Sequence, residues 1–402
     1  MTKWQSQLFE VDAPSDAPVD AAIAIANAIR SVNPLLPPLF TLSHLAHEAG
    51  VPYKYLRNTV ARHKVDEQYT VFRIQKRAPS PTAQYRWIAA PHPLLLKTQR
   101  WINTNILKNI HVNDAAFAYV KEGSAYKAAS LHKHAKWLMK VDIRNFFESI
   151  LEPKICKVFE VAGYQPLLSF ELSRICTRIA NPDMEHSITA NGSTRPGLKG
   201  KKYSIAAYDS FALGHLPQGA PTSPMLANIV AKEIDEEINL LAKRYALRYS
   251  RYSDDIVLSS TSIEFGKELA KKVVGKVYRV LLNAGYQPNV EKTKISGPGS
   301  KMIVLGLLVD GKVPRLTSEF KDKLRMHLYF CRTRGPQAHA IARKFDSLLG
   351  LKNHLIGLIS YAGMVDSAFA DQCFKELNAC KWPILDVVDF DEIIKSSAAL
   401  SP

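Results

Sequence analysis

The amino-acid sequence predicts an α+β protein in which helices accompany an antiparallel sheet. Residues 247–260 alternate apolar and polar side chains on both sides of a polar turn, which is typical of a β-hairpin. Residues 137–143 are almost wholly apolar, as expected of a buried strand. The chain from residue 314 onward has the spacing of apolar side chains that helices show. The sequence therefore predicts a sheet followed by a helical C-terminal part.

The N-terminal part is expected to contain helices and one hairpin. A helix over residues 21–32 should end before a run of prolines. Residues 41–62 predict two helices that meet at Gly50. This pattern is similar to a DNA-binding helix-turn-helix, and it is equally the commonest way to pack two helices on a core. Residues 69–75 and 84–88 predict a β-hairpin, and residues 94–107 and 126–134 predict helices.

The central part should alternate helices with polar loops. Helices are expected over residues 145–151, 167–179, 225–244 and 262–284. The polar, glycine-containing interval 181–215 predicts an exposed insertion. Residues 303–309 predict a further strand, and Thr317 or Ser318 should cap the helix that follows.

Charge and cysteine content limit the class of protein. The chain has 53 basic and 37 acidic residues, a net charge of +16, which favours nucleic acid over a membrane surface as partner. Its five cysteines form no CxxC pair and no zinc-type cluster, which fits a reducing cytoplasm. The first residues lack a signal-peptide pattern, and no run approaches the roughly 20 apolar residues of a membrane span. We therefore expect a soluble cytoplasmic protein.

Three acids are candidates for a metal site. Asp142 ends the buried strand, and Asp254 and Asp255 occupy the hairpin tip. One antiparallel sheet can bring all three carboxylates to one point, where they would suit two divalent ions acting in phosphoryl transfer. The alternatives are a solvated turn for the Asp254–Asp255 pair and an N-cap for Asp142.

Four sequence blocks occur together in a known order. They are YRWIAAP (residues 85–91), VDIRNFFESI (141–150), LPQGAPTSPMLAN (216–228) and YSDD (252–255), with NVEKTKI (289–295) and IVLGLLVDG (303–311) behind them. Over residues 70–365 the chain resembles the bacterial retron-type reverse transcriptases. The nine consecutive residues 216–224 are the most specific part of this resemblance.

The resemblance implies how the site would work. Asp142, Asp254 and Asp255, helped by the backbone carbonyl of Ile143, would bind two Mg²⁺ ions. Phe147 would be the steric gate that excludes a ribose 2′-hydroxyl, with a core phenylalanine as the alternative.

Four further residues complete the implied site. Gln218 and Gly219 would lie against the incoming nucleotide and template, where glycine permits close approach. Arg86 would contact triphosphate oxygens, which suit a guanidinium fork. Lys292 would help to protonate pyrophosphate, with a solvated surface lysine as the alternative.

Some positions depart from the retron pattern. Ala128, Ala129 and His132 stand where the family carries an NAxxH element, so its asparagine is absent. Leu305 replaces the threonine of a VTG element, and Ser253 replaces the usual alanine of the fourth block.

The implied fold is a right-hand polymerase. An N-terminal helical extension (residues 1–68) would pack on fingers (69–136), followed by a palm (137–300) and a helical thumb (301–402). The implied function is RNA-directed DNA polymerase, with a structured noncoding RNA as template and primer, an RNA–DNA hybrid, dNTPs, and an effector protein in antiphage defence. The alternatives are a defence reverse transcriptase of a non-retron group and a non-catalytic RNA-binding scaffold with the same fold.

Overall fold

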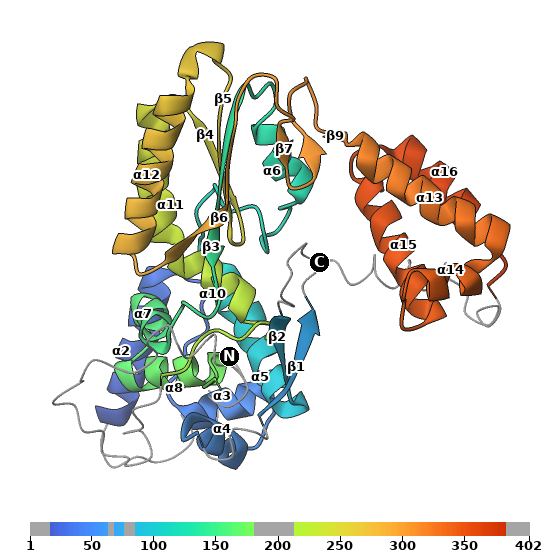
Figure 1. Cartoon of the computed structure of the whole chain (residues 1–402). Helices are drawn as coiled ribbons and strands as arrows, with labels where there is room; N and C mark the ends of the chain where they lie inside the picture. The colour runs from blue at the N-terminus through green and yellow to red at the C-terminus, as the bar shows by residue number, and fades with distance from the viewer. Residues whose placement is uncertain (1–16, 63–67, 76–84, 181–212, 383–402) are drawn as a thin grey trace. The chain divides into compact units, whose positions relative to one another are not determined.

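A computed structural model describes residues 17–62, 68–75, 85–180 and 213–382 (Figure 1). The chain divides into two compact units, described separately here. The first comprises residues 1–123, 139–258 and 267–295, and the second comprises residues 124–138, 259–266 and 296–402. Helices accompany antiparallel sheets, so the predicted α+β class is confirmed. The predicted insertion at 181–215 lies outside the described residues except for its last three.

A four-stranded sheet positions the acids in the first unit. Its strands are β3 (Trp137–Arg144), β4 (Arg248–Tyr252), β5 (Asp255–Ser260) and β6 (Gln287–Ser296), in the order β4-β5-β3-β6. Leu138, Met139, Val141 and Ile143 of β3 are at most 1% exposed. An inner strand that is buried on both faces needs such a continuous apolar run, which is why the sequence predicted β3 correctly.

Two helices, α11 (Lys232–Arg244) and α12 (Lys267–Asn283), run along one side of this sheet (Figure 1). The α12 side chains at 270, 273, 274, 277 and 281 are buried, which is the spacing of one helix face. The helix predicted over residues 262–284 begins later than expected, because a 3₁₀ turn (Ile263–Phe265) and Gly266 precede it. The predicted helix 225–244 is two helices, because α10 (Ser223–Val230) ends at Ala231 before α11 starts.

The N-terminal helices are α2 (Ala17–Val32), α3 (Leu42–Ala49) and α4 (Tyr53–Val60). Thr41 caps α3, and Gly50 ends it with a φ of +60°. Helix α3 packs on α4 and α5 (Pro93–Asn105), and α4 packs on α8 (Pro166–Cys176). Leu45 and Leu56 are fully buried in these contacts. The α3–α4 pair thus uses its apolar residues for packing inside the first unit.

A β-hairpin follows the N-terminal helices. Strands β1 (Tyr69–Gln75) and β2 (Tyr85–Pro91) are antiparallel, with Tyr69 opposite Pro91 and Gln75 opposite Tyr85. The prediction of a hairpin here is confirmed. Helix α5 starts two residues after β2 and leads into a short 3₁₀ turn (Leu107–Asn109).

The helix predicted over residues 145–151 is wrong. Asn145 has a φ of +48°, a left-handed conformation that a right-handed helix cannot contain. The segment folds as turns instead, and helix α7 (Glu152–Val161) begins only after them. These turns bury Phe146 at 3% exposure and leave Phe147 half-buried.

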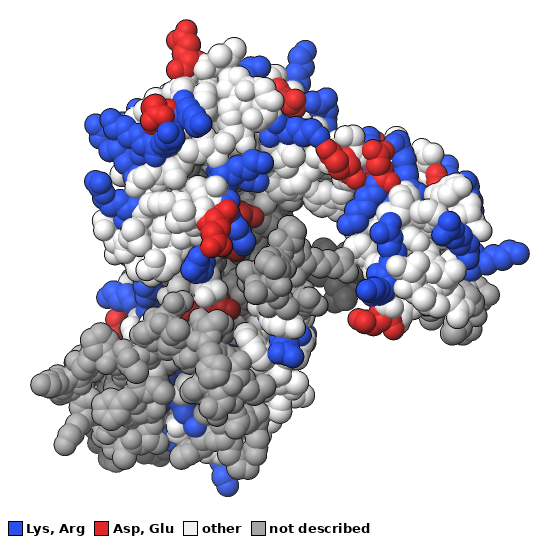
Figure 2. Space-filling model, viewed as in Figure 1, with Lys and Arg blue, Asp and Glu red and all other residues white. Residues whose placement is uncertain are grey.

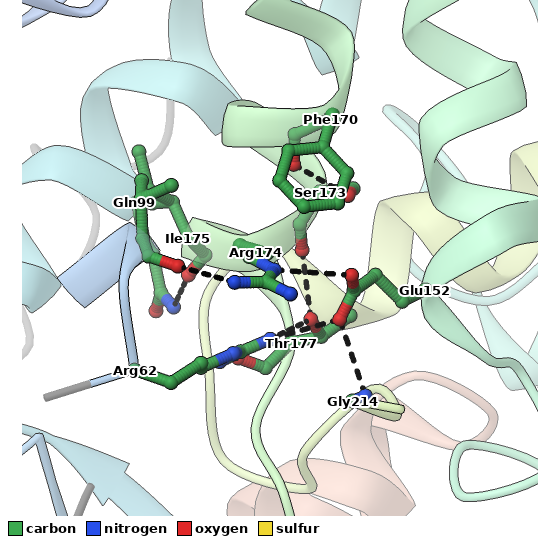
Figure 3. A network of polar contacts seen from close by, with 10 residues as sticks. Arg62, Gln99, Glu152, Phe170, Ser173, Arg174, Ile175, Thr177 and Gly214 are labelled. Atoms are coloured by element: carbon green, nitrogen blue, oxygen red, sulfur yellow. Dashed lines mark hydrogen bonds and ion pairs between the residues drawn. The ribbon is translucent and has the colours of Figure 1, made fainter. Parts of the chain in front are cut away.

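A buried ionic network joins the N-terminal extension to α7 and α8 (Figure 3). Arg62 donates to Glu152 Oε2 at 3.2 Å and to the backbone oxygen of Thr177 at 2.6 Å. Arg174 donates to Glu152 Oε1 at 3.3 Å, and the backbone N–H of Gly214 donates to Glu152 Oε2 at 3.2 Å. Glu152 is 1% exposed and Arg174 is fully buried. One carboxylate therefore accepts hydrogen bonds from two buried guanidinium groups.

In the second unit, α6 (Ala125–Leu131) accompanies a sheet of three short strands, β7 (Ile303–Val304), β8 (Leu307–Leu308) and β9 (Arg315–Leu316). The single strand predicted at 303–309 is wrong, because Leu305 and Gly306 have φ values of +47° and +85°. Two consecutive positive values make the tight turn of a two-residue hairpin. Tyr361 donates to the Leu305 carbonyl at 2.7 Å and holds this turn in place.

Four helices complete the described part of the second unit: α13 (Ser318–Arg334), α14 (Pro336–Ala342), α15 (Leu348–Gly363) and α16 (Ser367–Asn378). Thr317 caps α13 by accepting a hydrogen bond from the Phe320 N–H at 3.2 Å, as predicted. Helix α13 packs on α14 and α16, and α15 packs on α16. Over the described residues 314–382, the predicted helical C-terminal part is confirmed apart from β9.

Candidate active site

The hairpin tip between β4 and β5 is a tight two-residue turn. Ser253 has a φ of +60°, the left-handed conformation that such turns require at one position. Its side chain is buried, and the hydroxyl of Tyr119 lies 3.3 Å from its Oγ. Ser253 therefore shapes the turn, which places Asp254 and Asp255 at the tip.

A buried guanidinium supports the turn from behind. Arg251 of β4 is fully buried and donates to both carboxylate oxygens of Asp235 on α11, at 2.8 and 2.7 Å. It also donates to Asn228 Oδ1 at 2.9 Å and to the Ser253 carbonyl at 3.1 Å. The hydroxyl of Tyr249 donates to Asp235 at 2.5 Å. The same guanidinium thus bonds to α11, to α10 (Asn228) and to the turn, so the turn cannot shift without disturbing a buried network.

The third acid lies on the neighbouring strand. The Ile143 N–H on β3 donates to the Asp254 carbonyl at 3.1 Å, which fixes the tip beside Asp142. From β6, Asn289 donates to Asp142 Oδ1 at 2.8 Å. Lys292 Nζ lies 3.2 and 3.1 Å from the two Asp142 oxygens. The structure therefore brings Asp142, Ile143, Asp254 and Lys292 together.

The acids disfavour one another's charge. Burial and the nearby Asp142 carboxylate raise the pKa of Asp254, while Lys292 and Arg86 lower it. Burial of the surroundings and repulsion by Asp254 and Asp142 raise the pKa of Asp255 to about 6, although its own side chain reaches solvent. A concentration of negative charge this strong is a place where a cation is stabilised.

The three carboxylates are suitable ligands for a hard cation, but they do not lie in the arrangement of a complete metal site. Among the described residues, no three His, Cys, Asp or Glu side chains lie close enough together to hold a metal ion. Asp142 instead pairs with the ammonium group of Lys292. The Asp142, Asp254 and Asp255 oxygens are ligands that Mg²⁺ accepts, and their repulsion is what a divalent ion would remove.

The loop before α10 packs directly on β2. The Ala89 N–H donates to the Gln218 carbonyl at 2.7 Å. Gly219 has a φ of +112°, and a Cβ there would lie 2.9 Å from the Ala89 carbonyl oxygen. Only glycine permits this approach. The Gln218 amide donates to Glu148 at 3.0 Å, so Gln218 and Gly219 are fixed through both backbone and side chain.

Phe147 and Arg86 complete the set of predicted residues. The Phe147 ring lies 5.8 Å from Phe146 and 6.4 Å from Tyr119, centroid to centroid. Arg86 is exposed on β2, near enough to Asp254 to lower the pKa of that carboxyl. The predicted residues thus lie on β2, β3, the turns after β3, the hairpin tip, β6 and the loop before α10, all in the first unit.

Comparison with known proteins decides the family. The family model described as "Reverse transcriptase (RNA-dependent DNA polymerase)" matches residues 74–309, more than half of the chain. The chain belongs to the reverse transcriptase family. This membership confirms the predicted RNA-directed DNA polymerase and its right-hand fold. The residue bounds of extension, fingers, palm and thumb stay a prediction.

The reverse transcriptase has curated relatives of the predicted type. It is 28% identical over 310 residues to the Retron Ec86 reverse transcriptase of Escherichia coli, covering 76% of this chain and 83% of that protein. It is 27% identical over 346 residues to the Retron Mx162 reverse transcriptase of Myxococcus xanthus, covering 83% and 65%. The predicted resemblance to retron reverse transcriptases is therefore confirmed.

A solved structure of telomerase from Candida albicans in complex with a telomeric RNA fragment is also similar. It is 11% identical with a TM-score of 0.38, over 83% of this chain and 66% of that one. In the described part of the reverse transcriptase, no helix is both long enough and apolar enough to cross a membrane.

Sequence reasoning missed the residues that support the reverse transcriptase site. Arg251, Asp235 and Asn289 were not singled out, although Arg251 donates to the turn, Asp235 holds Arg251, and Asn289 donates to Asp142. Arg251 offered one signal, a charged side chain in a predicted strand that also carries Tyr249 and Tyr252. The positions of its partners depend on how α10 and α11 pack, which no local pattern gives.

We expect Arg251→Lys to weaken both the fold and the activity of the reverse transcriptase. Lysine is a point charge and cannot reach Asp235, Asn228 and the Ser253 carbonyl together, so the free energy of unfolding should fall by about 1–3 kcal/mol. Loss of support for the turn should lower primer extension by about 10–100-fold. Denaturant unfolding and extension rates test this, with Arg244→Lys on the exposed face of α11 as control. Equal losses in both variants would contradict the role given to Arg251.

Proposed function

We propose that this reverse transcriptase copies an RNA template into DNA at the site formed by Asp142, Asp254 and Asp255. The carrying observation is the 3.1 Å hydrogen bond from the Ile143 N–H to the Asp254 carbonyl. It joins two sequence blocks that lie far apart in the chain, and this supports a site that both blocks would share. The raised pKa values of Asp254 and Asp255 support a site designed for a cation.

Two Mg²⁺ ions would be held by Asp142, Asp254 and Asp255 with the Ile143 carbonyl. When bound, the ions supply the charge that activates a primer hydroxyl and balances the leaving pyrophosphate. Lys292 now pairs with Asp142, and this pairing keeps its ammonium group within the site. Since Lys292 is 61% exposed, it can release Asp142 and reach the pyrophosphate as a proton donor.

The incoming deoxynucleotide would lie between the hairpin tip and the Gln218–Gly219 loop. Gly219 lets the backbone come close to the nucleotide, and the amide of Gln218 is already oriented by Glu148. Arg86 is exposed and close to the acids, which suits a contact with the triphosphate. Phe147 is half-buried, unlike Phe146, so its ring is available as a gate against a 2′-hydroxyl.

A basic surface of the first unit supports a structured RNA partner and an RNA–DNA hybrid. Figure 2 shows lysine and arginine side chains over α12, where Lys271, Lys272, Lys276 and Arg279 lie on one helix. Such charges bind phosphate groups without reading sequence. In the second unit, Lys321 and Arg325 form ion pairs with Asp366 and Asp322, so they contribute less to such a surface.

The template proposed is a structured noncoding RNA, because the curated relatives are retron reverse transcriptases. Antiphage defence with an effector protein, in the cytoplasm, is the corresponding biological proposal. Sequencing the nucleic acid that copurifies with the protein tests it. A branched RNA–DNA species supports a retron product, whereas unbranched DNA alone would favour a defence reverse transcriptase of a non-retron group.

Primer extension tests the enzymatic proposal. Purified protein, a primed RNA template, magnesium and dNTPs should give extended DNA. Failure with 2′-hydroxyl, 3′-hydroxyl and protein-linked primers would favour a non-catalytic RNA-binding scaffold.

Phe147→Ala should weaken the selection of deoxynucleotides. Removing the ring opens space for a 2′-hydroxyl, and we expect the ratio of kcat/KM for dNTP over rNTP to fall by at least about 10-fold, or about 1.4 kcal/mol in the transition state. Single-nucleotide extension with each substrate measures this ratio. Phe330→Ala is the control, since it makes the same change at a half-buried phenylalanine of α13, outside the site. An unchanged ratio would make Phe147 a packing residue.

A further inference from the structure

The segment from Ala115 to Gly123 is fixed beside the hairpin tip. Arg251 N–H donates to the Ala115 carbonyl at 2.7 Å, and Phe117 N–H donates to the Arg251 carbonyl at 2.9 Å. The Asn228 side chain donates to the Ala118 carbonyl at 2.7 Å. Residues 115–118 therefore pair with β4 and with α10, the two elements that carry the tip and the nucleotide loop.

Directly after this anchor, the chain turns with a strained tyrosine. Tyr119 has a φ of +63°, although it is neither glycine nor asparagine. A bulky residue in this region costs free energy and persists only where its surroundings enforce it. Gly123 closes the turn: a Cβ there would lie 2.2 Å from the Phe117 carbonyl oxygen. The turn thus holds Tyr119 in a conformation that the residue itself disfavours.

The strained residue points its ring at the nucleotide gate. The Tyr119 and Phe147 rings meet edge to face, with centroids 6.4 Å apart and planes at 60°. The Tyr119 hydroxyl lies 3.3 Å from Ser253 Oγ in the turn that carries Asp254. Half of the Tyr119 side chain is exposed, at 50%, so burial of the ring does not explain the strain. What the conformation achieves is contact with Phe147 and Ser253 at once.

We propose that Tyr119 is a positioning residue for sugar selection. It holds the Phe147 ring at a fixed distance from the hairpin tip, so that the space beside the sugar stays too small for a 2′-hydroxyl. This inference rests on the proposed function, in which Phe147 is the gate. Phe146 supports the Phe147 ring from the core, and Tyr119 supports it from the solvent side.

Four variants separate the ring, the hydroxyl and the strain. Tyr119→Gly and Tyr119→Ala both remove the ring and should lower the dNTP-over-rNTP ratio of kcat/KM by about 10-fold, the upper range for one aromatic pair. Tyr119→Phe keeps the ring and should hold the ratio within about 2-fold of wild type. Only glycine relieves the left-handed strain, so Tyr119→Gly should unfold at a higher temperature than Tyr119→Ala. In Phe147→Ala, adding Tyr119→Gly should cause no further loss of selection, because both act on one gate.

Glu122→Gly is the matched control. Glu122 has a φ of +62° in the same turn and is exposed, so this variant relieves equal strain without changing the Tyr119 ring. It should leave sugar selection unchanged. Two results would overturn the proposal. One is a Tyr119→Gly enzyme whose dNTP-over-rNTP ratio equals that of a wild type that extends primers. The other is a double variant, Phe147→Ala with Tyr119→Gly, in which the two losses of selection add. If wild type extends no primer, or Phe147→Ala leaves selection intact, the proposed function fails and this inference fails with it.

Discussion

Asp254→Asn is expected to lower primer extension by at least about 10³-fold, which is about 4 kcal/mol of transition-state stabilisation. The substitution keeps the size of the side chain and removes the negative charge that would bind a divalent ion. The Asp254 carbonyl still accepts the Ile143 N–H, so the tip should stay beside β3. Loss of rate would then report the chemistry of the carboxylate rather than its placement.

The same substitution should not destabilise the protein. Asp254 is one cause of the raised pKa of Asp255, which shows that the two carboxylates repel each other in the folded state. Removing one charge relieves this repulsion, so the unfolding temperature should stay equal or rise. Activity and stability would move in opposite directions, as is common where a site gathers like charges for function.

Extension rates and thermal unfolding, measured on the same preparations, test this prediction. The control is Asp114→Asn, which makes the same chemical change at an exposed residue outside the site. It should leave both quantities unchanged. An Asp254→Asn variant that extends primers at near wild-type rates would remove Asp254 from the proposed metal site.

The sequence predicted the elements whose pattern is local. Strand β3 is apolar except at Lys140, Asp142 and Arg144, because an inner strand is buried on both faces. The hairpin tip was predicted because alternation on both sides defines its strands, and the turn residues are polar. Resemblance to a family then supplied candidate roles for Gln218 and Gly219, which no periodicity marks.

Left-handed residues account for several misplaced elements. Asn145 and Leu305 lie in segments that look helical or extended, and their positive φ values turn the chain instead. Such values depend on contacts with distant parts of the chain, as the bond from Tyr361 to the Leu305 carbonyl shows. Tyr119, within the site, also has a positive φ that depends on a distant contact. Its ring meets Phe147, which lies 28 residues further along the chain.

The buried charges also could not be predicted from local sequence patterns. Glu152 looks like an ordinary first-turn glutamate, which would stabilise helix α7 through the helix dipole. Its neighbours in the sequence do not include its partners, which come from three distant places: Arg62 after α4, Arg174 on α8 and Gly214 before the nucleotide loop. Only the packing of these segments shows that its carboxylate is a structural centre of the first unit.

Glu152→Ala should therefore destabilise the protein by about 3–5 kcal/mol, a large share of the stability of a typical domain. The reason is not the lost attraction alone. Arg62 and Arg174 would remain buried at 8% and 0% exposure without the carboxylate that neutralises them. The Gly214 N–H would also lose its acceptor, two residues before the loop that carries Gln218. We expect extension to fall together with stability.

Denaturant unfolding of paired variants separates buried charge from helix effects. Glu160→Ala is the control on the same helix: its pair with Lys157 is 37% and 71% exposed, and such pairs contribute about 0–1 kcal/mol. If unpaired charge is the cause, adding Arg174→Met to Glu152→Ala should recover part of the loss, because one buried guanidinium is removed with its stem volume retained. A further loss in that double variant would instead mean that Arg174 is held mainly by its bond to the Val60 carbonyl at 2.9 Å.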